Sequence, residues 1–109
     1  SVEQISKPFT LKNIIQHINK AFDHRVRLGI MSILMVNEYA DFNMLKELLG
    51  ATDGNIASHT KALEKEEYIK VEKSFINRKP NTRYIATAEG REAFSKHIEA
   101  LEKLINPND

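Results

Sequence analysis

The stretch NMLKELLGATDGNIASHTKALEKE, residues 43–66, decides the fold. Asn43 is expected to cap a short helix that Gly50 ends, because Asn favours helix N-caps and Gly favours the left-handed position after a helix. Thr52 is then expected to cap a second helix that runs to about Glu66. Two short helices joined by a tight turn that contains Gly form a helix-turn-helix.

The second helix has two faces of different chemistry when its residues are placed at about 100° intervals. The face expected to lie in the core carries Ile56, Thr60 and Leu63. The opposite face is small, polar and cationic, with Gly54, Ser58, Lys61 and Lys65 on it and Asn55 and Ala62 on its flank. A face of this kind suits the major groove of B-DNA, which admits one α-helix.

The predicted DNA-contacting residues of this helix are Asp53, Gly54, Asn55, Ser58, His59, Lys61 and Lys65. Asn55 and Ser58 are candidates for base-edge hydrogen bonds, since recognition helices lead with their N-terminal residues. The two lysines are expected to meet phosphates, and the glycine allows close approach of the backbone. His59 is expected to be a packing or phosphate-contacting residue. Two alternatives stay open: the whole face is simply solvated, or Asn55 only caps the helix.

Past Glu67 the apolar spacing changes from helical to alternating, which is typical of strands. Strands are expected over 68–76 and 84–87 with a turn over 77–82, so residues 68–87 form a hairpin, or wing. No acidic residue lies between Lys73 and Ala88, and Pro80 is expected to stiffen the turn. The wing residues predicted to contact phosphates or enter the minor groove are Arg78, Lys79, Asn81 and Arg83. The alternative is an ordinary solvated hairpin tip.

Apolar helices are expected on both sides of these elements. Thr10 and Thr87 are expected to cap helices over 10–22 and 88–105, whose apolar stripes need a partner and predict a two-fold homodimer. The segment 26–36 is apolar nearly all round and is expected to be a core helix, with Asp23 as its cap and a left-handed Asn37 at its end. Residues 39–42 predict a short strand. Arg25 and Arg27 are assigned structural roles, with the DNA backbone as the alternative.

The ordered set of these segments resembles the winged-helix regulators of the MarR and ArsR type, particularly their short members. The resemblance runs from Leu11 to Ile105 and rests on these stretches: 42–50, 56–59, 63–69, 77–84 and 87–90. It implies a single domain over 1–109 that is mainly α with a small β-hairpin, a winged helix-turn-helix. It also implies a small bacterial-type transcriptional regulator that binds a near-palindromic operator as a homodimer, with recognition helices about 34 Å apart.

Two residues depart from the family pattern. Thr60 stands where these families usually place a core leucine, and Glu67 stands where they usually have the glycine that ends the recognition helix. A left-handed conformation costs a residue other than Gly about 1–2 kcal/mol. Neither departure removes a contact to DNA.

Composition narrows the remaining function classes. The 109 residues contain no Cys and four His without convincing ligand spacing, so neither a metal site nor another cofactor is expected. No apolar run approaches a membrane span and the start lacks a secretory layout, so the sequence predicts a cytoplasmic protein. The sequence contains neither a phosphate-binding loop nor a Ser/His/Asp grouping, so it is not expected to be an enzyme. The alternative function is a winged-helix protein-interaction module that does not bind DNA.

Overall fold

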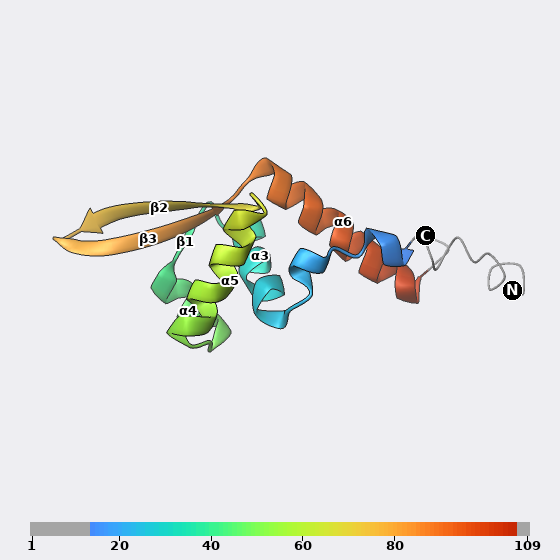
Figure 1. Ribbon diagram of the computed structural model, residues 1–109, viewed down its shortest axis with the longest axis horizontal. Coiled ribbons are helices and arrows are strands. Elements are labelled where there is room, and N and C mark those ends of the chain that lie inside the picture. The colour runs from blue at the N-terminus through green and yellow to red at the C-terminus, as the bar shows by residue number, and fades with distance from the viewer. Residues whose placement is uncertain (1–13, 107–109) are drawn as a thin grey trace, which may run out of the picture.

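The structure, a computed structural model, describes residues 14–106 (Figure 1). It is mainly helical, with a three-stranded antiparallel sheet, and has the predicted winged helix-turn-helix fold. After a helical segment at 14–17, the elements are η1 (Lys20–Phe22), α3 (Arg25–Val36), β1 (Ala40–Asp41), α4 (Phe42–Leu49), α5 (Asp53–Lys65), β2 (Ile69–Ile76), β3 (Lys79–Ala86) and α6 (Ala88–Ile105). The β2–β3 hairpin projects from one end of the molecule and α6 extends toward the other.

The helix-turn-helix forms as predicted, although its first cap differs. Asp41, not Asn43, is the N-cap of α4, because its extended backbone is followed by a helix from Phe42 and its carboxylate accepts a hydrogen bond from the Met44 N–H at 2.8 Å. Gly50 ends α4 in the left-handed region, with φ 59°. Thr52 caps α5 as expected and accepts from the Asn55 N–H at 3.2 Å.

Both ends of α3 also differ from the sequence prediction. His24, not Asp23, is the N-cap, since its Nδ1 accepts from the Val26 N–H at 3.1 Å. Asn37 does end the helix, but with an extended backbone at φ −129°. Its side-chain amide donates to the Ile33 carbonyl at 2.8 Å, so it satisfies a helix-end carbonyl without the left-handed conformation.

The helix predicted over 10–22 is interrupted before its end, and its start at Thr10 lies outside the described residues. Helical backbone at 14–17 is followed by an extended Asn19 and then by η1. The Asn19 backbone N–H donates to His97 Nδ1 at 2.9 Å, and its side chain accepts from the Ala21 N–H at 2.8 Å. A partner on α6 therefore favours the break in this helix.

The wing has a shorter turn than predicted. Strand order is β1-β3-β2, and the β2–β3 ladder continues to the pair Ile76 and Lys79. Only Asn77 and Arg78 lie between the strands, both at positive φ (52° and 67°), which is the backbone of a two-residue hairpin turn. The predicted turn over 77–82 is therefore wrong for 79–82, which belong to β3. Pro80 lies opposite Phe75 in the ladder rather than in the loop.

At the end of α5, Glu67 has a left-handed backbone, at φ 64°. The Glu67 N–H donates to the Glu64 carbonyl at 2.9 Å, and the Tyr68 N–H donates to the Leu63 carbonyl at 3.0 Å. These are the two bonds of a Schellman helix end, in which Gly is the usual left-handed residue. Thr60 is buried, and its hydroxyl donates to the Ile56 carbonyl at 2.7 Å, so the core at this position contains no unpaired hydroxyl.

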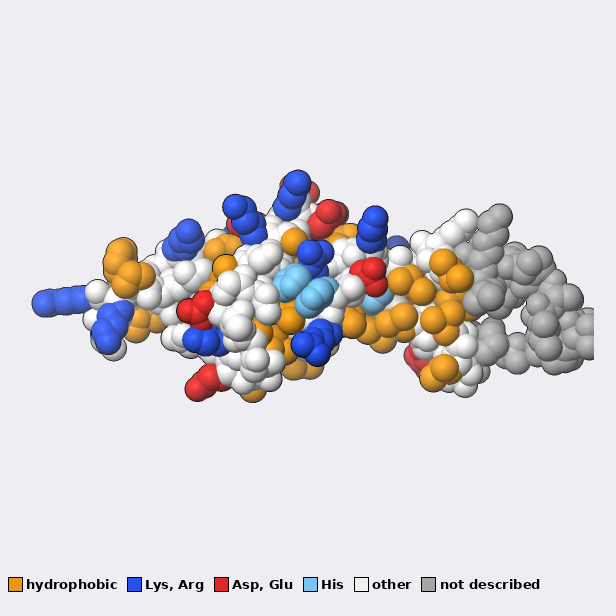
Figure 2. Space-filling model, turned by 60° about the horizontal axis from the view of Figure 1, so that its bottom comes forward, with side chains coloured by type: hydrophobic (Ala, Val, Ile, Leu, Met, Phe, Trp, Pro, Cys, Tyr) orange, Lys and Arg blue, Asp and Glu red, His pale blue; other side chains and the backbone are white. Residues whose placement is uncertain are grey.

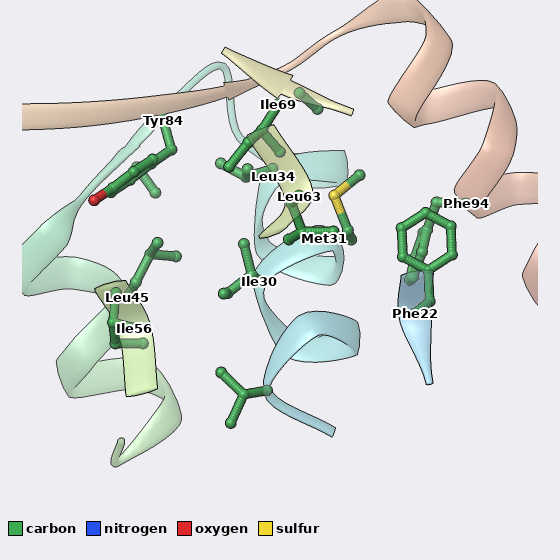
Figure 3. Packing of buried hydrophobic residues seen from close by; sticks show 13 residues of the cluster. Phe22, Ile30, Met31, Leu34, Leu45, Ile56, Leu63, Ile69, Tyr84 and Phe94 are labelled. Carbon is green, nitrogen blue, oxygen red and sulfur yellow. The ribbon is translucent and has the colours of Figure 1, made fainter. Parts of the chain in front are cut away.

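The core has two parts (Figure 3). Leu45 and Ile56 of the helix-turn-helix lie beside Ile30 of α3, and all three are fully buried. A second group lies toward α6, where the Phe22 ring packs edge-on against Phe94 with centroids 5.2 Å apart. Packing on both sides of α3 thus fixes α5 relative to α6, and the buried central helix agrees with the sequence prediction.

Candidate nucleic-acid interface

The outer face of α5 is exposed and its inner face is buried, as the helical spacing predicts. Ile56, Thr60 and Leu63 are buried. The exposed residues are Gly54, Asn55, Ser58, Lys61 and Lys65. Because Thr52 supplies the cap, Asn55 is not needed as the N-cap, and its side chain lies on the exposed flank. The face therefore presents two neutral polar side chains near the helix start and two cations farther along.

Asp53 has a partner within the helix-turn-helix. Its carboxylate lies 2.7 Å from Lys46 Nζ, and both side chains are largely exposed. The pair connects α4 to the first turn of α5, where a negative charge also favours the helix dipole. An exposed ion pair contributes at most about 1 kcal/mol to stability. Its more direct effect is to hold Lys46 beside the start of the exposed face.

The wing cations separate into two groups. Arg78 and Lys79 are exposed at the turn, and Lys73 is exposed on β2. Arg83 lies nearer the base of the wing, where its guanidinium is 3.4 Å from Glu72 Oε1 and 4.3 Å from the centroid of the Tyr39 ring. Residues 73–88 contain no acid, but strand pairing in the folded hairpin brings Glu72 opposite Arg83. Half-buried Asn81 lies opposite Ser74, between these groups.

The tip of the wing is also apolar, a feature that was not predicted from the sequence. Phe75 is 76% exposed and Ile76 is 52% exposed, directly beside the cations of the turn. Two consecutive apolar residues next to a hairpin turn were the available signal, since neighbours in a strand point to opposite faces. The hairpin extends past the body of the domain, so neither face is covered at its tip (Figure 1).

His59 lies on the inner edge of the α5 face. Its Nδ1 accepts from Arg27 Nε at 3.0 Å, and its ring centroid is 4.1 Å from that of His24. Burial, followed by the neighbouring His24 and Arg27, lowers the pKa of His59 below its ordinary value and favours the neutral ring. Arg27 also donates to the Ala21 carbonyl at 3.3 Å, which agrees with the structural role expected of it.

Figure 2 shows the face on which these groups meet. Lys and Arg side chains are spread along it from the tip of the wing to the body, and histidine side chains lie side by side near its middle. Among residues 14–106, no group of three or more His, Asp or Glu side chains is placed to hold a metal ion. Within the same range, no helix has the length and apolar character needed to span a membrane.

A helix-turn-helix with a polar, cationic helix face and a β-hairpin wing defines the winged-helix class of DNA-binding domains. Residues 26–105 match the family described as a winged helix DNA-binding domain, and the chain belongs to this family. Regulator-like domains of this kind are typically non-enzymatic.

Two relatives have substantial sequence identity to this chain. An uncharacterized protein of Methanocaldococcus jannaschii is 39% identical over 85 residues, which cover 78% of this chain and 92% of that protein. The structure of a transcriptional regulator homologue from Pyrococcus horikoshii has 31% identity and a TM-score of 0.79, covering 92% of this chain and 97% of that one. Both organisms are archaea, so these similarities do not support a bacterial-type regulator in particular.

The fold also resembles that of MarR from E. coli in its apo form. The TM-score is 0.65 with 9% identity, covering 93% of this chain and 80% of that one. This likeness confirms the predicted MarR-like fold and leaves the DNA contacts of individual residues as predictions.

Proposed function

We propose that the protein is a transcriptional regulator that binds double-stranded DNA sequence-specifically as a homodimer. One observation carries the proposal: the solvent-exposed face of α5 is small, polar and cationic, while its other face is fixed in the core. A helix with this division presents side chains to a groove without disturbing its own packing. A solvated surface helix that does not bind DNA would not need a second cationic element beside it. The wing supplies such an element, because Arg78 and Lys79 are exposed at its turn.

In this proposal α5 enters the major groove and the wing contacts the backbone or the minor groove. Asn55 and Ser58 read base edges, Gly54 permits close approach, and Lys61 and Lys65 bind phosphates. Asp53 holds Lys46 beside the groove. Arg78 and Lys79 form the contacting tip of the wing, whereas Asn81 and Arg83 support it from farther along β3.

A dimer supplies the second recognition helix. Ile98 and Ile105 of α6 are 42% and 79% exposed, which agrees with an apolar stripe that a second chain covers. A two-fold pair of α5 helices about 34 Å apart fits a near-palindromic operator. Light scattering at micromolar concentration should give the mass of two chains, and the mass of one chain would refute this part of the proposal.

The main experiment is a titration into labelled duplex from the region upstream of the protein's own gene, beside a scrambled duplex, at several salt concentrations. We expect tighter binding to the upstream duplex and a steep decrease of affinity with salt. Arg78→Ala should weaken binding to both duplexes and lower the salt slope by about one. Asn55→Ala or Ser58→Ala should cost about 1–3 kcal/mol, mainly on the specific duplex.

A second function is favoured by the apolar tip of the wing. Exposed Phe75 and Ile76 suit a protein partner, and a winged helix that binds proteins needs no DNA. Absence of binding to either duplex, even at low salt, together with tolerance of charge reversal at Arg78 and Lys79, would favour this second function over the first.

A further inference from the structure

We propose that His24 and His59 together form a binding site for one phosphate of the DNA backbone, through two neutral N–H donors. This inference rests on the proposed function, since it assigns one contact within the proposed complex. The two residues come from different elements, the N-cap of α3 and the middle of α5, and their rings lie 4.1 Å apart at 32°. Histidine side chains lie side by side among Lys and Arg side chains on the face shown in Figure 2.

Hydrogen bonds determine which nitrogen of each ring carries the proton. His24 Nδ1 accepts from the Val26 N–H at 3.1 Å, and His59 Nδ1 accepts from Arg27 Nε at 3.0 Å. A ring nitrogen that accepts a hydrogen bond carries no proton, so each neutral ring carries its proton on Nε2. Both rings are therefore fixed as donors at the nitrogen that points away from the protein contact.

Both Nε2 donors are available to a ligand. Within residues 14–106, no buried side-chain nitrogen or oxygen lacks a hydrogen-bond partner, and no protein group accepts from His59 Nε2. This nitrogen is therefore in contact with solvent, and His24 is an exposed residue. Two N–H groups on adjacent rings match an anion with two or more acceptor oxygens, as a backbone phosphate has.

The hydrogen bonds at Nδ1 also bear on the charge of the site. Protonation of His59 would have to occur at Nδ1, where it would break the bond to Arg27. The lowered pKa of His59 agrees with a ring that stays neutral. The site therefore binds phosphate through neutral donors, with Arg27 as the nearby positive charge. It should add affinity for any sequence and contribute little to the salt dependence.

Asparagine tests this site because its Oδ1 replaces Nδ1 as an acceptor, while it lacks a donor at the position of Nε2. His24→Asn should keep the cap of α3, since Asn is a preferred N-cap residue. His59→Asn should keep an acceptor for Arg27. Each variant should melt within a few degrees of the wild type and bind both the upstream and the scrambled duplex about tenfold more weakly. The salt slope should stay unchanged.

The double variant tests whether both rings contact the same phosphate. Two donors on one phosphate predict a combined loss clearly smaller than the product of the single losses, because they act as one unit. If the loss of affinity in the double variant equals the product of the two single losses, the rings contact separate phosphates and the shared site is overturned. If His59→Asn lowers the melting temperature strongly, the duplex affinity of His24→Asn alone tests whether the site contacts a phosphate.

If both single variants bind duplex with wild-type affinity, the inference is overturned. If Arg78→Ala still weakens duplex binding in that case, the proposed function stands. Absence of DNA binding by the wild type would refute both. Inorganic phosphate at constant ionic strength is the remaining probe. Histidine ring NMR shifts that saturate with it at micromolar concentration would reassign the site to free phosphate and overturn the DNA contact.

Discussion

Replacing Glu67 by Gly should stabilise the protein, because Glu67 has a left-handed backbone at φ 64°. Its conformation is held on both sides, since its N–H donates to the Glu64 carbonyl and its own carbonyl accepts from Thr87 Oγ1 at 2.8 Å. The left-handed conformation costs a residue with a Cβ about 1–2 kcal/mol. Gly removes that cost, and its greater freedom in the unfolded chain takes back about 0.4–1 kcal/mol.

The expected net gain for Glu67→Gly is about 1 kcal/mol, or a melting temperature higher by about 4–8 °C in a domain of this size. Glu67→Ala is the matched control, because it removes the same carboxylate from the end of α5 but keeps the Cβ. Any gain from removing a negative charge near a helix C-terminus, a few tenths of a kcal/mol, is common to both variants. The difference between Gly and Ala therefore isolates the backbone term.

The assay is chemical denaturation followed by circular dichroism, with all variants at one protein concentration because a dimer's stability depends on concentration. Equal unfolding free energies for the Gly and Ala variants would refute the reasoning. They would mean that the Schellman bonds at this position hold the left-handed conformation without strain. Because the Gly and Ala variants carry the same charge near Lys65, their affinities for duplex should equal each other.

Three further predictions follow from single contacts. Burial lowers the pKa of His97 below its ordinary 6.5, so as the pH falls the unfolded state takes up a proton before the folded state does. The contribution of neutral His97 to stability should be full above pH 6.5 and should decrease as the pH falls toward the folded-state pKa. His97→Gln should therefore reduce the difference in unfolding free energy between denaturation curves at about pH 7.5 and about pH 5.5. Arg91→Ala should cost about 1.5–3 kcal/mol of unfolding free energy, since its guanidinium donates to two carbonyls at the end of α3, and an unchanged melting curve would contradict it. Arg83→Ala should lower the salt slope of DNA binding by less than Arg78→Ala, because only Arg83 is paired with an acid; equal slopes would show that the pair opens in the complex.

Much of the fold could be predicted because it depends on local periodicity. The helix-turn-helix, the stop at Gly50 and the caps at Thr52 and Thr87 all follow from neighbouring residues, and the structure confirms them. The family resemblance marked Glu67 as standing at the usual glycine position, and the structure has it left-handed. The face of α5 could be predicted for the same reason. Which of its residues contact DNA remains a prediction.

Some of the errors occur where a partner elsewhere in the chain decides the conformation. The break at Asn19 depends on His97, which is 78 positions away and packs in the aromatic group around Phe22. The ion pair of Arg83 depends on the register of the hairpin, which in turn depends on a turn of Asn77 and Arg78. Arg is not a residue that signals a left-handed turn, so the sequence pattern placed the turn too broadly.

The junction of the wing with α6 gives a last prediction, in which the same substitution has opposite effects at two glycines. A Cβ on Gly90 would collide with the backbone of Tyr68, whereas a Cβ on Gly54 would meet nothing within 4 Å. Thr87 bridges this junction, because its Oγ1 accepts from the Gly90 N–H and donates to the Glu67 carbonyl. Gly90→Ala must therefore push α6 away from the base of the wing, and it should destabilise the protein by about 1–3 kcal/mol.

Gly54→Ala should instead stabilise the protein by about 0.5–1 kcal/mol, since Ala favours a helix and the space is open. If the start of α5 lies against the groove, the added methyl group should weaken DNA binding in the more stable protein. A gain in stability with lower affinity cannot come from damage to the fold, so it would locate the DNA at this end of the helix. A gain in stability with unchanged affinity would place the backbone of Gly54 away from the duplex and confine the predicted contacts to side chains farther along α5.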